Sequence, residues 1–351
     1  MNSSENNTNG IGDTTSSEMV NLARKHVSDI LRVAMEHSDS QTALVVLDTR
    51  CDLALILGEA YRHCLPHAQF INFDEVTPQT VLDAFETLKP SDLVVLIQST
   101  SFRLNAFRIR IELFNRSLKV IEHPHLLRMV DLEARYYIDS LAYDAEYYRG
   151  TGNALKQRID CASRGVVDSG GESLIFESGF EIAKLNVGDY SGMKNWGGQF
   201  PIGEVFTEAK DLDFVNGRVR IFAFGDNAFR VNLPQKPITL VVGRSKVTDV
   251  IDSTPEFDQV LANIRADEGE VWVRELGLGL NRAFTQSRVV SDIGTFERMC
   301  GIHLSLGAKH AIYKKPQFTQ KTARHHVDVF AVTETVTFDG HSVYQNGAWR
   351  A

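Results

Sequence analysis

Cysteine is scarce in this sequence and occurs in no paired motif. The 351 residues include four, Cys51, Cys64, Cys161 and Cys300, and no two of them form a Cys-x-x-Cys pair. So few cysteines in a chain of this length exclude a disulfide framework. We therefore expect buried thiols that pack like small hydrophobic side chains.

Long apolar runs, a secretory leader and an excess of positive charge are also missing. The longest apolar runs, TALVVL and DLVVLI, are far shorter than the roughly 20 residues that a membrane span needs. Residues 1–17 lack the basic start and apolar stretch of a secretory signal, which predicts a disordered tail and no export. The formal charge of −8 gives no support to nucleic acid or an anionic membrane as a partner. We expect a cytoplasmic protein with a small ligand.

Segments typical of strands and helices alternate through the first half of the chain. Apolar spacing over 18–37 predicts a helix, and the runs TALVVLD, AQFINFD, DLVVLIQ and SLKVIE predict strands with helical stretches between them. This alternation predicts a parallel sheet with helices on its faces. No Gly-x-Gly-x-x-Gly or Walker sequence is present, so the sheet is expected to be a scaffold and not a nucleotide site.

The pattern changes at about residue 165, after a polar and aromatic helical stretch. Short alternating segments then dominate, such as ITLVVGRSKVTDVI and VDVFAVTETVTF, with a helix near TPEFDQVLANI. We therefore predict two domains. An α/β N-terminal domain spans 18–164, and a β-rich α+β domain spans 165–351.

Several segments of the β-rich half offer side chains that bind divalent metal ions. These candidates are Glu204, Glu275, His303, His326 and Asp328. Glu275 interrupts the apolar runs VWV and LGLGL, where an unpaired carboxylate would be costly to bury. His326 and Asp328 alternate along a predicted strand, so that both face one side and can meet one ion. The pattern predicts a metal centre in this half.

Four segments, in this order, resemble the aminopeptidase T family of metallopeptidases, the thermophilic leucyl aminopeptidases. They are GEVFT at 203–207, ELGLGLN at 275–281, GIHLSLG at 301–307 and HHVDV at 325–329. The resemblance implies that the five candidates hold one or two divalent ions (zinc, manganese, cobalt or iron), with one glutamate shared. Paired ions activate a water molecule and polarise the carbonyl that it attacks. Glu204 or Glu275 would also accept a proton.

The chain departs from this family at one position of the predicted centre. The family has a tyrosine seven residues after the equivalent of His303, and this chain has His310 there. His310 is a candidate for a further ligand, an oxyanion donor or a surface residue, with Tyr313 close by as a substitute. Arg282 and Tyr313 are candidates for binding the substrate. The other basic residues considered for a substrate carboxylate are Arg274, Lys314 and Lys315.

A second branch of the same fold family provides the alternative function. It contains the 2,5-dihydroxypyridine 5,6-dioxygenases, which open a pyridine ring with a single Fe(II). That branch has a histidine where this chain has Glu275, and its lid histidine falls near Phe102. A non-catalytic binding protein is the third hypothesis, and the presence of all five ligand types disfavours it. The leading prediction is a metal-dependent hydrolase, expected to be a homodimer, that acts on an amide or similar bond of a small molecule or short peptide.

Overall fold

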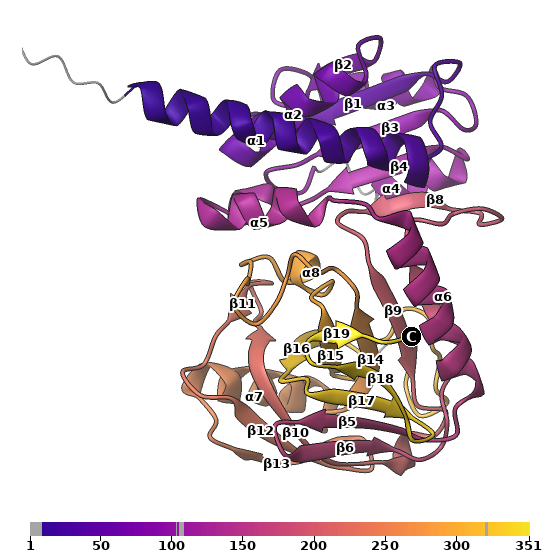
Figure 1. Ribbon diagram of the computed structural model, residues 1–351, viewed down its shortest axis with the longest axis vertical. Coiled ribbons are helices and arrows are strands. Elements are labelled where there is room, and N and C mark those ends of the chain that lie inside the picture. The colour runs from indigo at the N-terminus through magenta and orange to yellow at the C-terminus, as the bar shows by residue number, and fades with distance from the viewer. Residues whose placement is uncertain (1–8, 103, 105–108, 320–321) are drawn as a thin grey trace, which may run out of the picture. The chain divides into compact units, whose positions relative to one another are not determined.

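The computed structural model describes residues 9–102, 104, 109–319 and 322–351 (Figure 1). The chain forms two compact units. Unit 1 comprises Met1–Tyr143 and Gly188–Pro201, and unit 2 comprises Asp144–Val187 and Ile202–Ala351. None of the helices in the described ranges combines the length and the apolar character that crossing a membrane requires.

Unit 1 is built on a parallel sheet of five strands in the order β2-β1-β3-β4-β8. The strands are β1 (Ala43–Leu47), β2 (Gln69–Asn72), β3 (Leu93–Ile97), β4 (Lys119–His123) and β8 (Trp196–Gln199). The helices are α1 (Asn9–Asp29), η1 (Ile30–Ala34), α2 (Asp52–Cys64), α3 (Pro78–Glu86), α4 (Ile109–Asn115), η2 (Leu126–Arg128) and α5 (Leu132–Ser140). Strands β1 and β3 are buried along their whole length, as expected for apolar strands covered on both faces. The predicted α/β class is confirmed.

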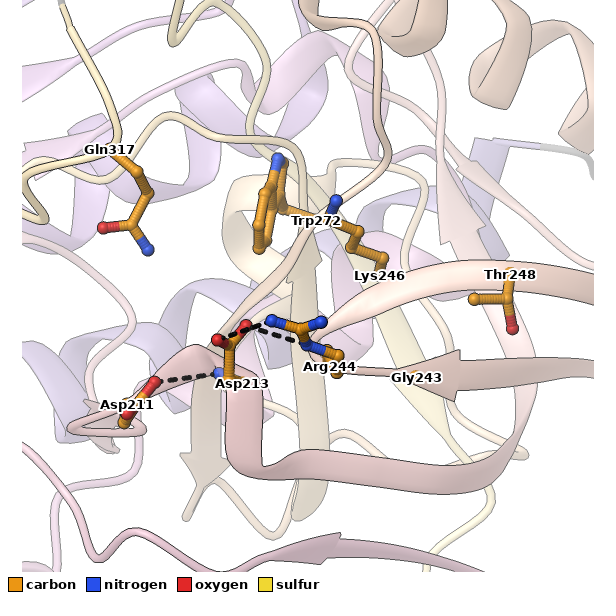
Figure 2. Close-up of a pocket in the computed structure, with 8 residues that line it drawn as sticks. All are labelled: Asp211, Asp213, Gly243, Arg244, Lys246, Thr248, Trp272 and Gln317. Carbon is orange, nitrogen blue, oxygen red and sulfur yellow. Dashed lines mark hydrogen bonds and ion pairs between the residues drawn. The ribbon is translucent and has the colours of Figure 1, made fainter.

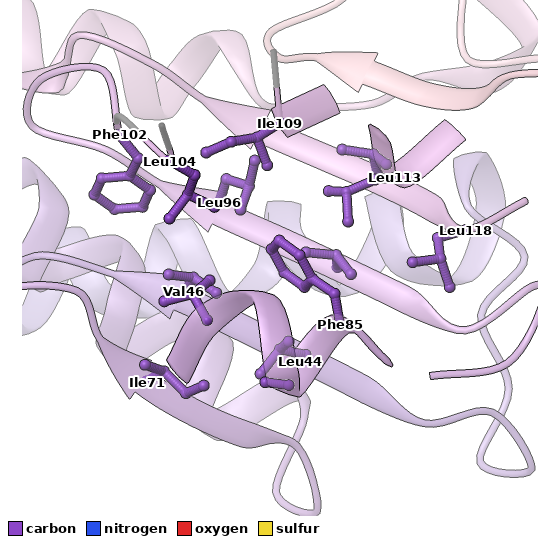
Figure 3. Close-up of a cluster of buried hydrophobic side chains, with 14 residues drawn as sticks. Leu44, Val46, Ile71, Phe85, Leu96, Phe102, Leu104, Ile109, Leu113 and Leu118 are labelled. Atoms are coloured by element: carbon purple, nitrogen blue, oxygen red, sulfur yellow. The ribbon is translucent and has the colours of Figure 1, made fainter. Parts of the chain in front are cut away.

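A cluster of buried side chains from β1, β3, α3 and α4 forms part of the core of unit 1 (Figure 3). Phe102 belongs to this cluster, and its ring stacks on Phe73 with 4.2 Å between the ring centroids. The backbone N–H of Phe102 donates to Gln98 Oε1 at 2.8 Å. The position nearest to the lid histidine of the dioxygenase branch therefore holds a core aromatic residue.

Strand β8 was not expected from the sequence. It lies in the glycine-rich stretch NWGGQF, which has no strand-like alternation of apolar residues. A Cβ on Gly197 would lie 2.0 Å from the carbonyl oxygen of Val120, so this strand approaches β4 closely because it has no side chain there. Since β8 belongs to unit 1, the units do not divide at the single boundary after residue 164 that the sequence suggested.

Two smaller expectations also differ from the structure. Helix α1 begins at Asn9, so the disordered tail expected over 1–17 does not reach residue 17, and residues 1–8 lie outside the described part of the chain. The cysteines are free, but only Cys300 is buried. Cys161 is exposed, and Cys51 and Cys64 are half-buried. Burial of all four thiols was therefore a wrong expectation.

Unit 2 is built on an antiparallel sheet of 14 strands. Its main path runs in the order β19-β18-β17-β5-β6-β10-β16-β15-β14-β9-β7; off this path, β11 and β12 pair with β10, and β13 pairs with β12. The strands are β5 (Gly165–Ser169), β6 (Glu172–Phe176), β7 (Lys184–Asn186), β9 (Glu204–Glu208), β10 (Val215–Gly225), β11 (Val231–Asn232), β12 (Ile238–Gly243), β13 (Lys246–Ile251), β14 (Val273–Gly279), β15 (Gly301–Leu306), β16 (Val327–Ala331), β17 (Thr335–Phe338), β18 (His341–Gln345) and β19 (Ala348–Trp349). The helices are α6 (Ala145–Cys161), η3 (Leu212–Phe214), α7 (Pro255–Glu268) and α8 (Ile293–Phe296). The predicted β-rich class is confirmed.

Candidate metal centre

Four neighbouring strands of the unit 2 sheet carry the predicted ligands. Their order is β16-β15-β14-β9, and each pairs antiparallel with the next. Glu204 begins β9, Glu275 lies in β14 and His303 in β15, while Asp328 lies in β16 directly after the segment with His326. Adjacent strands are only about 4.8 Å apart. The pairing therefore collects side chains that are far apart in the sequence.

A β-bulge and a glycine shape the middle of this arrangement. The register of β14 against β15 shifts between Val273 and Leu276, and Glu275 lies in this shift with its N–H bonded to Ser305 Oγ at 3.0 Å. A bulge redirects the side chain that it carries. Gly277 lies directly opposite His303, and a Cβ there would be 2.0 Å from His303 Nε2. The imidazole ring thus occupies space that only a glycine leaves open.

Glu204, Glu275 and His303 converge on one buried point. His303 Nε2 lies 3.3 Å from Glu204 Oε1 and 3.5 Å from Glu275 Oε1. One ligand atom from each residue falls within 4.8 Å of the others, and all three residues are buried. These separations suit one metal ion with bonds of about 2.0–2.2 Å to each atom.

A second group of side chains adjoins this point through the other oxygen of Glu275. His310 Nε2 lies 2.9 Å from Glu275 Oε2, and the ring centroids of His310 and His326 are 6.2 Å apart. His326 Nε2 lies 3.1 Å from Asp328 Oδ1. Oε1 of Glu275 therefore faces His303 and Oε2 faces His310, whereas His326 and Asp328 pair with each other and do not belong to the group of three.

The buried polar atoms of the centre face one another and little else. Nε2 of His303 faces Glu204 and Glu275, and Oδ1 of Asp328 faces His326. Nδ1 of His303 is buried and has no hydrogen-bond partner among the described residues. Imidazole nitrogens and carboxylate oxygens gathered at one buried point are the donors that a divalent cation binds, so the donor set fits a metal ion.

Hydrogen bonds at Nδ1 separate the roles of the two remaining histidines. Nδ1 of His326 faces the carbonyl oxygen of Lys309 at 3.1 Å, so it carries the proton and leaves Nε2 free as a ligand. Nδ1 of His310 instead accepts the N–H groups of Ile312 and Tyr313, at 3.2 and 3.3 Å. The neutral ring of His310 therefore carries its proton on Nε2, which makes it a donor toward the centre and not a ligand.

Charge in the centre favours added cations. Burial lowers the pKa of His303, but the neighbouring carboxylates outweigh it and raise that pKa well above its usual value. Burial likewise lowers the pKa of His326, and Asp328 raises it to about 10. Burial raises the pKa of Glu275, whereas its bonds to the imidazoles of His303 and His310 lower it below the ordinary range. The carboxylates thus stabilise the protonated imidazoles, and the same negative charge would stabilise bound metal ions.

The architecture matches that of a solved structure, wild-type AmpT (aminopeptidase T) from Thermus thermophilus. The match has a TM-score of 0.58 and covers 94% of this chain and 99% of the AmpT chain, at 12% sequence identity. The chain has the fold of AmpT. No protein-family model matches the sequence. No curated protein matches it either. The likeness to AmpT, expected from four short segments, is confirmed at the level of the fold.

Two residues of the centre were missed by the sequence reasoning. Arg298 is buried, and one of its guanidinium nitrogens lies 3.1 Å from Glu204 Oε2 and 2.6 Å from Glu297 Oε2. Burial raises the pKa of Glu297 to about 7, although Arg298 opposes this shift. The available signal was a Glu-Arg pair placed among apolar residues in TFERMCGIH, directly before the strand of His303.

Glu268 at the end of α7 positions the segment with His310. Its carboxylate accepts the backbone N–H of Ala308 at 2.7 Å and those of Arg324 and His325 at 2.6 Å each. These contacts fix both ends of the connection between β15 and β16. The segments that carry His310 and His326 are therefore held by Glu268, which is not one of the candidate ligands.

The structure does not place the predicted substrate-binding side chains among the ligands. The guanidinium of Arg282 pairs with Asp144 at 3.1 Å and stacks 3.9 Å from the ring centroid of Tyr147, at an exposed position. The hydroxyl of Tyr313 donates to the carbonyl oxygen of Ile182 at 2.8 Å, although its ring packs on His310. These contacts do not support a substrate-binding role for Arg282 or for the Tyr313 hydroxyl.

The other basic candidates do not face the centre either. Arg274 forms a buried ion pair with Glu208. Lys315 is also buried, with its amine 2.6 Å from Glu181 and bonded to backbone carbonyls. Lys314 is exposed. Arg274 and Lys315 thus stabilise unit 2 and are not free to hold a substrate carboxylate.

A surface groove of about 690 Å³ in unit 2 contains none of the predicted ligands (Figure 2). Its residues are Asp211, Asp213, Gly243, Arg244, Lys246, Thr248, Trp272 and Gln317. Arg244 pairs with Asp213 at 2.8 Å, and Lys246 pairs with Glu270 at 3.0 Å while lying over the ring of Trp272. Because Arg244 and Lys246 are already paired with carboxylates, the described residues of the groove offer no free cation for a ligand, and the metal centre is the better candidate for the functional site.

Gly277→Ala is expected to disturb the centre without changing any ligand. The new methyl group would overlap the ring of His303, and moving a reacting group by about 1 Å costs about 10²-fold in rate. We expect lower metal occupancy and an activity loss of that order, measured by metal titration and steady-state kinetics. Gly150→Ala is the control, because nothing lies within 4 Å of its Cβ position in α6. Equal activity of both variants would contradict the packing of His303 on Gly277.

Proposed function

We propose that this protein is a metal-dependent hydrolase that breaks an amide or similar bond of a small molecule or short peptide. The observation that carries the proposal is the convergence of Glu204, Glu275 and His303 at one buried point of the AmpT fold. The buried imidazole and carboxylate atoms that face one another at this point support the same reading.

The residues divide into two sets around Glu275. Glu204 and His303 would hold one divalent ion, and His326 and Asp328 would hold another, with the two oxygens of Glu275 directed to different sides. Zinc, manganese and cobalt suit such imidazole and carboxylate donors. When bound, such ions lower the pKa of a water molecule and polarise the carbonyl of the substrate.

The balance of charge supports one or two ions. Glu204, Glu275 and Asp328 supply three carboxylates, and Arg298 contacts Glu204 and Glu297, whose pKa is raised to about 7. The two to three negative charges that remain would be balanced to within about two units by either one or two divalent ions. Buried charges without such compensation are strongly unfavourable.

The protein groups beside the ions would handle the protons. Glu275 is the candidate proton acceptor. Burial raises its pKa, but the bonds to the imidazoles of His303 and His310 outweigh burial and keep the carboxylate ionised at neutral pH. His310 presents N–H from Nε2, so it is placed to donate to an oxygen on which negative charge develops. This assignment gives His310 a catalytic role in place of a ligand role.

Metal content and oxygen dependence test the proposal. For full-length protein purified without added metal, we expect about two divalent ions per chain and hydrolysis of short peptides or amino-acid anilides that proceeds equally under nitrogen and in air. Chelation should abolish the hydrolysis, and zinc, manganese or cobalt should restore it. One iron per chain with oxygen consumption on an aromatic substrate would replace this proposal with the ring-cleaving dioxygenase. Protein that binds no divalent ion would overturn both.

A further inference from the structure

Arg298 contacts one oxygen of a predicted ligand and leaves the other free. It lies between α8 and β15, is 7% exposed, and its Nη1 is 3.1 Å from Glu204 Oε2. The second oxygen of the same carboxylate, Oε1, is the one that lies 3.3 Å from His303 Nε2. The two oxygens of Glu204 thus face different partners.

We propose that Arg298 is a positioning residue that restricts Glu204 to binding its metal ion through Oε1 alone. The inference rests on the proposed metal site. A carboxylate with both oxygens free can chelate an ion, whereas a guanidinium bound to one oxygen occupies its lone pairs and withdraws negative charge. A single-oxygen ligand leaves a coordination position open for water or substrate, which catalytic sites require.

The surroundings of Arg298 hold it in this orientation. The same Nη1 lies 2.6 Å from Glu297 Oε2, and the carbonyl oxygen of Arg298 accepts the N–H of Asn281 at 2.8 Å. Glu297 therefore helps to hold the guanidinium nitrogen that contacts Glu204. A lysine at this position has one compact ammonium group and can keep the bond to Glu204 while losing the fixed geometry.

Cobalt titration of the metal-free, full-length protein tests the inference. In the wild type we expect Co²⁺ to give the visible absorption of a low coordination number. In Arg298→Met, Glu204 is freed to chelate, so the band should weaken as the coordination number rises, the affinity for Co²⁺ should not fall, and kcat should fall at least about 10-fold. A merely structural residue would lower affinity and leave the spectrum of the bound ion unchanged.

Two further variants provide the controls. Arg298→Lys should restore the wild-type spectrum, because it keeps a cation on Oε2. Arg244→Met removes the same type of side chain from an exposed pair with Asp213 and should change neither the spectrum nor the affinity. An Arg298→Met protein with the wild-type spectrum, or with weakened binding alone, would overturn the proposal.

A measurement on the wild type keeps the inference testable if Arg298→Met does not fold. The infrared difference between Zn²⁺-loaded and metal-free protein reports the splitting of the carboxylate stretches, which is wide for single-oxygen binding and narrow for chelation. We expect a wide splitting that Glu204→Gln removes. A narrow one would contradict the role of Arg298, whereas absence of any Zn²⁺ binding would contradict the proposed function itself.

Discussion

His326→Ala is expected to lower kcat by at least about 10³-fold and to reduce the metal content. Nε2 of His326 faces Asp328, and its Nδ1 is held by the carbonyl of Lys309, so the ring is oriented as a ligand. An ion contributes several kcal/mol to the stabilisation of a transition state, and each 1.4 kcal/mol or so is a factor of ten in rate. Metal analysis and steady-state kinetics measure the two effects, and circular dichroism should show an unchanged fold.

His325→Ala is the matched control, because the two histidines are adjacent but have different partners. His325 Nε2 lies 2.7 Å from Asp267 at the end of α7, whereas His326 Nε2 faces Asp328. An ion pair at this partly exposed site contributes little to stability. We expect wild-type metal content and activity. Full activity of His326→Ala at unchanged metal content would remove His326 from the ligand set.

Most of the fold could be predicted from the sequence, because most strands and helices have a characteristic spacing of apolar residues within their own segment. The fully apolar runs of β1 and β3 predict covered strands, and the change to alternating residues at Gly165 marks the first strand of unit 2. Strand β8 could not be predicted from the sequence, because its own residues show no such local pattern. Its two central glycines carry no pattern, and its place beside β4 depends on a close backbone approach that only the folded sheet reveals.

The candidate ligands were named from the sequence, but their arrangement was not. The three residues of the centre meet because their strands, β9, β14 and β15, are neighbours in the sheet. In the chain these strands lie far apart. Strands β10 to β13 and helix α7 separate β9 from β14, and helix α8 separates β14 from β15. Chain order does not reveal that pairing. The glycines of ELGLGLN looked like a family signature, whereas the structure shows that Gly277 makes room for the ring of His303.

The roles of single side chains depended most on tertiary contacts. The sequence allows His310 to be a ligand or an oxyanion donor, and two backbone N–H groups at its Nδ1 place the proton of the neutral ring on Nε2, which favours the donor role. Arg282 carries the right charge for a substrate carboxylate, yet it pairs with Asp144 at the surface. The sequence shows residue types, while hydrogen bonds from distant segments decide which of their atoms remain available.

Arg274→Met is expected to lower the free energy of unfolding of unit 2 by about 3–5 kcal/mol. Arg274 and Glu208 are almost fully buried, and the guanidinium also donates to the carbonyl oxygens of Ala308 and Tyr313. The variant leaves Glu208 with Lys315 as its remaining described cation, at 3.9 Å. Removing one partner of a buried pair costs this much because the other charge stays buried without compensation. Urea unfolding followed by tryptophan fluorescence measures the loss.

The double variant Arg274→Met/Glu208→Leu separates the cost of an unpaired charge from the value of the pair. Replacing both members of a buried ion pair by apolar residues is often neutral or stabilising. We therefore expect the double variant to regain most of the stability lost by Arg274→Met. Arg244→Met, which breaks an exposed pair, should leave the unfolding midpoint unchanged. If Arg274→Met unfolds at the wild-type midpoint, Glu208 is compensated by other groups and Arg274 becomes available again as a candidate for substrate binding.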